Sequence, residues 1–91
     1  MLSELEKASV TDAVHALVGD MPIGVPFGFR RLRALLSERH GITDDVRDDE
    51  EFKPTVEETM DRMLTYPKAI PDLQIAPEVD GELQWVRAGA V

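Results

Sequence analysis

The sequence predicts an α+β domain in which three helices are followed by a C-terminal two-stranded β-hairpin. Three observations support this fold class. Apolar residues recur with helical period in three segments of the first two thirds of the chain, and they alternate with polar residues in the last third. The third observation is the length of 91 residues, which suits one domain. We therefore expect a single domain over residues 1–91, with an ordered core over about residues 9–88.

The first predicted helix carries one apolar stripe at positions i, i+3, i+4, i+7 and i+8: Val10, Ala13, Val14, Leu17 and Val18. Ser9 is a candidate N-cap and Gly19 is a candidate stop. Ser3 and Glu6 also have the spacing of a capping box, so a start one or two turns earlier stays open. Residues 21–28 contain two prolines and two glycines, which predicts a connector.

The second and third predicted helices have similar apolar faces. The second closes at His40-Gly41, and its buried side is expected to contain Phe29, Leu32, Leu35 and Leu36. The third opens at Thr55, because Glu58 follows at capping-box spacing, and ends at Pro67. Its inner face is expected to contain Val56, Met60, Met63 and Leu64. Residues 43–53 show no period and carry many like charges, so we predict an acidic mobile loop there.

The predicted hairpin turns at Asp80-Gly81. A two-residue turn would pair Ile75 with Val86. A three-residue loop with Gly81 in the left-handed region would instead place Ile75 beside Trp85, and we favour this register because it gathers the large apolar side chains on one face. Trp85 is then expected in the core. The alternative is that its side chain projects into solvent and contacts a partner.

Helix, helix, helix and hairpin is the order of elements in winged-helix domains, and the chain resembles that family over about residues 9–88. The resemblance includes the hairpin from Leu73 to Val86. Two departures are visible: the connection between the second and third helices is about eleven residues long, and a first strand is missing unless residues 23–25 supply it. In DNA-binding members the third helix enters the major groove and the hairpin contacts the backbone.

Charge is distributed unevenly along the chain. The net charge is −8, yet residues 21–40 carry four arginines and one glutamate, whereas residues 41–60 carry eight acidic and two basic side chains. The acidity is compatible with a binding surface and also with adaptation to a salty cytoplasm. There is no cysteine, no signal peptide and no apolar stretch long enough for a membrane span, so we expect a cytoplasmic protein.

The third predicted helix is the first candidate binding surface. If the winged-helix resemblance holds, its outward residues include Glu57, Glu58, Asp61 and Arg62. A surface with this excess of acid repels phosphate, so we expect a protein partner and a non-enzymatic regulatory or adaptor role. The acidic face would then bind a basic protein, and one version is that it imitates nucleic acid. An ordinary solvated face with a Glu58–Arg62 pair is the simpler interpretation.

The second candidate is the basic cluster Arg30, Arg31 and Arg33. Cations near a helix N-terminus oppose the helix dipole, so a partner is expected for them. The acidic loop is one partner, and DNA phosphate is the other. The alternative function is therefore a DNA-binding transcriptional regulator that uses these arginines and Arg87 of the hairpin. A homodimer, which would pool basic surface, is compatible with this alternative.

Metal, cofactor and catalytic sites are not predicted. The acidic run lacks the central glycine of a calcium loop, since no glycine lies between Gly41 and Gly81. His15 and His40 have no nucleophile or carboxylate in a recognisable catalytic arrangement. We therefore expect no enzyme activity.

Overall fold

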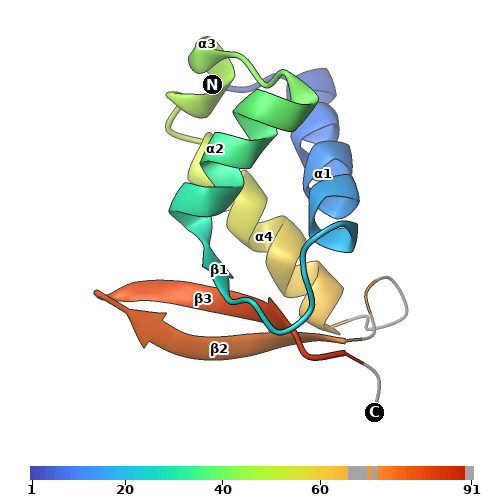
Figure 1. Cartoon of the computed structure of the whole chain (residues 1–91). Coiled ribbons are helices and arrows are strands. Elements are labelled where there is room, and N and C mark those ends of the chain that lie inside the picture. Colours follow the sequence, from blue (N-terminus) through green and yellow to red (C-terminus); the bar gives the residue numbers. More distant parts are fainter. Residues whose placement is uncertain (66–69, 71, 90–91) are drawn as a thin grey trace.

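A layer of helices lies on one side of a three-stranded antiparallel sheet (Figure 1). The computed structural model describes residues 1–65, 70 and 72–89. The elements are α1 (Glu4–Gly19), β1 (Phe27–Gly28), α2 (Phe29–His40), α3 (Asp44–Arg47), α4 (Phe52–Thr65), β2 (Leu73–Val79) and β3 (Glu82–Arg87). The predicted α+β class is confirmed. The sheet has a third strand that was not predicted, because β1 pairs with β3 in the order β1-β3-β2.

Helix α1 begins at the earlier of the two predicted starts. The Ser3 hydroxyl accepts a hydrogen bond from the Glu6 backbone N–H, and the Glu6 carboxylate accepts one from the Ser3 N–H, which completes a capping box. Ser9 therefore lies inside the helix. The predicted apolar stripe is buried as expected.

Strand β1 lies later in the chain than the candidate segment 23–25. Phe27 pairs with Trp85 and Gly28 with Gln84, whereas Ile23 makes an isolated bridge with Arg87. A Cβ atom at position 28 would collide with the side chains of Gln84 and Glu82 as they are placed, and glycine avoids this contact. Helix α2 follows at once, buries Leu32 and Leu36, and ends at Gly41 with φ 64°, as the sequence predicted.

The segment of residues 43–53, called the acidic segment below, contains more helix than predicted. Residues 44–47 form α3, and α4 begins at Phe52, three residues before the predicted start. Thr55 does not cap the helix, because its hydroxyl donates to the Glu51 carbonyl within the first turns. Pro54 fits there because the first-turn N–H groups need no helical partner. The mobility expected for residues 43–53 stays a prediction.

The buried face of α4 contains Val56, Met60 and Met63 as predicted, and Leu64 is half-buried. Phe52 joins this face and is also fully buried. The predicted end at Pro67 lies outside the described residues, and α4 is described as far as Thr65.

The hairpin has the predicted register and a different turn. Ile75 lies opposite Trp85, and Gly81 has φ 79°. However, Asp80 also has a positive φ of 52° and Val79 pairs with Glu82, so the turn has two residues and its type is I′. The register shift lies instead between Ala76 and Val79, where a bulge contains Pro77. A proline suits a bulge because the extra residue needs no ladder donor.

Trp85 lies at the centre of the core. It is 1% exposed, and its ring centroid is 6.2 Å from that of Phe27. The expected core role of Trp85 is confirmed. Its strand partner Ile75 is 62% exposed, although Leu73 and Ala76 of the same strand are buried.

Candidate functional site

The three arginines at the start of α2 have different surroundings. Arg33 Nη2 lies 2.5 Å from Asp48 Oδ1, just after α3. The internal partner expected for the cluster is therefore present for Arg33. Arg30 and Arg31 are exposed, and their side chains make no ion pair within the part of the chain that the structure describes.

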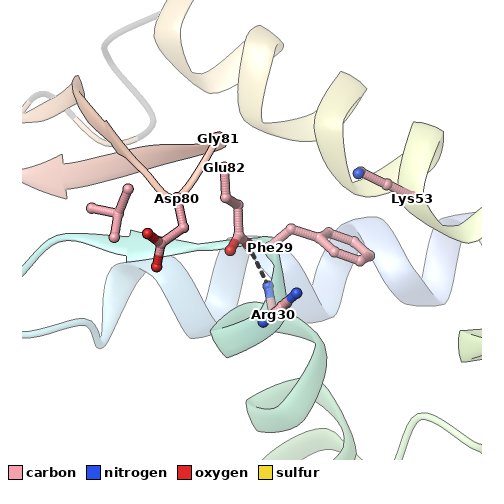
Figure 2. Close-up of a pocket in the computed structure, with 7 residues that line it drawn as sticks. Phe29, Arg30, Lys53, Asp80, Gly81 and Glu82 are labelled. Carbon is pink, nitrogen blue, oxygen red and sulfur yellow. Dashed lines mark hydrogen bonds between the residues drawn. The ribbon is translucent and has the colours of Figure 1, made fainter.

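A carboxylate from the hairpin occupies the N-terminus of α2. Glu82 Oε1 accepts a hydrogen bond of 2.9 Å from the Arg30 backbone N–H, as Figure 2 shows. A negative charge at this position stabilises the helix dipole and offsets the arginines that follow. This contact was not predictable from local sequence patterns, because Glu82 lies 52 residues away from Arg30 along the chain.

Arg87 does not join the other arginines. It lies at the end of β3 opposite to Glu82, and its Nη1 donates to the carbonyl oxygens of Gly19 at 2.7 Å and Met21 at 3.2 Å. This guanidinium connects the end of β3 to the end of α1. The basic surface expected from Arg30, Arg31, Arg33 and Arg87 is thus divided between the two ends of the sheet.

The acidic segment is attached to the start of α1 by charged hydrogen bonds. The N-terminal ammonium lies 2.7 Å from Asp49 Oδ2, and Lys7 Nζ lies 3.2 Å from Glu51 Oε2. The hydrogen bond from the ammonium lowers the pKa of Asp49, and the hydrogen bond from Lys7 lowers the pKa of Glu51. The same contacts raise the pKa of the N-terminal ammonium and of Lys7. Figure 1 places the N-terminus beside α3.

The exposed residues of α4 lie on more than one side of the helix. Glu58 and Arg62 form an ion pair with a nitrogen–oxygen distance of 3.0 Å and lie beside α1. Glu57 instead lines a hollow beneath the hairpin, and Asp61 is exposed. The predicted acidic face is therefore divided between a side toward α1 and a side toward the hairpin.

A groove of about 680 Å³ runs between α1 and α4. We call it the α1/α4 groove. Its walls are Glu4, Lys7, Ala8, Thr11 and Asp12 from α1, and Glu51, Pro54, Thr55, Glu58 and Arg62 from α4 and the residue before it.

The charges of the α1/α4 groove are not balanced. Both of its cations are paired within it, Lys7 with Glu51 and Arg62 with Glu58. Glu4 and Asp12 form no ion pair among the residues that the structure describes. The groove lining therefore has four carboxylates against two cations, and Glu4 and Asp12 are the two carboxylates without an ion pair of their own.

A smaller hollow of about 290 Å³ lies between the hairpin turn and the first turns of α2 and α4 (Figure 2). Lys53 Nζ lies 5.3 Å from the centroid of the Phe29 ring, which forms one wall. Glu82, which also lines the hollow, is bound to the first turn of α2. Lys53 and Glu82 of this hollow thus contact the protein itself, whereas the side chains of Arg30 and Asp80 form no ion pair among the described residues.

Metal ligands do not gather in the described parts of the chain, where no three His, Cys, Asp or Glu side chains form a metal-binding group. Residues 1–65, 70 and 72–89 also contain no helix long and apolar enough to cross a membrane. His15 and His40 are exposed on different helices.

No family model, curated protein or solved structure matches this chain. The function therefore has to be argued from the surfaces described above.

Proposed function

We propose that this domain is a non-enzymatic regulatory or adaptor module that binds a protein partner through its acidic surface. The surface consists of the α1/α4 groove and the adjoining acidic residues of α4. The observation that carries the proposal is the pairing of both groove cations within the groove, which leaves Glu4 and Asp12 without an ion pair and the groove lining with an excess of two negative charges. A basic partner surface would compensate them.

The winged-helix resemblance supports the same surface. Strand β1 precedes α2 and pairs with the hairpin, which is the order that the resemblance implies for a first strand. If the resemblance holds, α4 corresponds to the recognition helix of DNA-binding members. Because α4 exposes Glu58 and Asp61 in that position, we propose that it faces a basic protein, in one version by imitating nucleic acid. The cysteine-free composition suits a cytoplasmic setting.

A DNA-binding regulator is the second candidate, and the exposed pair Arg30 and Arg31 favours it. These two arginines are the remaining part of the predicted basic surface, because Arg33 is paired and Arg87 binds backbone carbonyls. Two phosphate contacts supply little affinity at moderate salt for a molecule of net charge −8. Binding as a dimer would double their number.

Fluorescence anisotropy with a labelled DNA duplex separates the two candidates. The protein-partner proposal expects no binding at moderate salt, and it expects the Arg30→Glu, Arg31→Glu variant to behave like the parent. Micromolar or tighter binding with a steep salt dependence, lost in that double variant, would contradict the proposal and favour the regulator. Arg39→Glu, which reverses an exposed arginine in the last turn of the same helix, is the control for a general effect of charge reversal.

A further inference from the structure

We infer that the α1/α4 groove receives a basic amphipathic helix of the partner protein, packed against α1 and α4 as a third helix. The inference deepens the proposed function and rests on it, because it specifies the secondary structure and charge of the partner. Its basis is the arrangement of small and charged side chains along the groove.

The α1 wall of the groove is one stripe of that helix. Glu4, Lys7, Ala8, Thr11 and Asp12 recur at i, i+3, i+4, i+7 and i+8. The stripe spans about 12 Å along the helix axis, since each residue adds about 1.5 Å. This length corresponds to about two turns of a partner helix whose contact residues recur at the same spacing.

Small side chains lie between the charged side chains of the groove, and their hydroxyl groups are hydrogen-bonded within the protein. Ala8, Thr11 and Thr55 are small, which allows a helix backbone to approach closely. The Thr55 hydroxyl donates to the Glu51 carbonyl, and Thr11 shares a hydrogen bond of 3.3 Å with the buried Thr59. Specificity therefore has to come from the carboxylates at the margins.

A helical partner fits the groove better than an extended one. Both walls are helix surfaces, whose backbone N–H and C=O groups bond within the helices, so an extended peptide would find no strand edge to pair with. A helix satisfies its own backbone groups. Lysine or arginine side chains on one face of it could then reach Glu4 and Asp12, while small or apolar residues cover the central part.

The test uses an alanine-based peptide of about sixteen residues, with lysines at i, i+3, i+4 and i+7 on one face. The comparison peptide has the same lysine content and prolines that prevent helix formation. Binding is measured by calorimetry at low and moderate salt. We expect the helical peptide to bind at least about tenfold more tightly than the proline peptide.

Variants locate the binding in the groove. The double variant Glu4→Gln, Asp12→Asn should bind the helical peptide about fivefold to tenfold more weakly than the parent. This is the loss of affinity expected for two exposed ion pairs. Glu38→Gln with Glu78→Gln removes two exposed carboxylates elsewhere and should change affinity less than twofold. Ala8→Trp keeps the charge and should block the groove. Circular dichroism verifies that each variant remains folded.

The outcomes separate this inference from the proposed function. Equal binding of the two peptides, or equal loss in the groove and control variants, would overturn the helix-in-groove inference and leave an acidic protein-binding surface standing. Absence of binding by the helical peptide would overturn the inference as well. If neither peptide bound and the domain bound DNA tightly, the proposed function itself would be overturned.

Discussion

The hairpin and the acidic segment are stabilised by different kinds of interaction. The hairpin of β2 and β3 is covered by helices and places Trp85 in the core. The segment from residue 43 to 51 has no fully buried side chain, and its charged groups contact distant cations: the N-terminal ammonium, Lys7 and Arg33. Apolar burial contributes several kcal/mol at one position, whereas exposed ion pairs contribute little each. We therefore expect order in the acidic segment to be more sensitive to pH and salt than order in the hairpin.

The largest expected effect is the loss of the Trp85 side chain. Trp85→Ala should lower the free energy of unfolding by about 3 kcal/mol or more, because it empties the centre of the core. Its strand partner offers a matched control: Ile75→Ala should cost about 0.5 kcal/mol, since the side chain is largely exposed. Urea unfolding followed by circular dichroism measures both. Equal losses at the two positions would show that the core is not centred on Trp85.

Acid should release the acidic segment before it unfolds the hairpin. The folded pKa values of Asp49 and Glu51 are lower than the unfolded ones, so their contribution to stability is complete above the unfolded values and is lost as pH falls through the folded values. We expect the protection of residues 44–51 against amide exchange, measured relative to the intrinsic exchange rate at each pH, to fall below about pH 4, while the protection of β3 is retained.

The Asp49→Asn, Glu51→Gln variant is the control for this pH profile. It lacks both titrating groups, so the protection of residues 44–51 should already be low at neutral pH and should change little on acidification. A parent protein with the same flat profile would show that these carboxylates do not stabilise the segment.

The smallest expected effect concerns the arginines of α2. Arg33→Ala should lower the free energy of unfolding by about 0.2–1 kcal/mol at low salt and by less at high salt, because its pair with Asp48 is partly exposed. Arg31→Ala, which removes an exposed arginine two residues away, should cost almost nothing. A larger cost for Arg31 than for Arg33 would contradict the assignment of Arg33 as the link to the acidic segment.

The periodic spacing of apolar residues predicted the helices and the hairpin, because this spacing depends on which side of an element is buried. The stripe of α1 and the opposition of Ile75 and Trp85 follow from apolar periodicity alone. The hydrogen bond from Arg30 to Glu82 and the two bonds from Arg87 were missed, because their partners lie more than fifty residues away. The start of α4 was placed too late, because the buried Phe52 belongs to an acidic run without period. Three of the α4 candidates, Glu58, Asp61 and Arg62, are exposed as predicted, whereas Glu57 is half-buried beside the hairpin. This difference depends on the packing of the hairpin against α4.

The central claim is that the acidic α1/α4 groove, and not the arginine pair of α2, makes the functional contact. The most direct measurement is a nuclear magnetic resonance titration of the isotope-labelled domain, once with the helical lysine peptide and once with a DNA duplex, at moderate salt. We expect the peptide to shift the amide signals of Ala8, Thr11 and Thr55, and the duplex to shift none. Shifts at Arg30 and Arg31 on addition of DNA, with no response of the groove to the peptide, would contradict the claim.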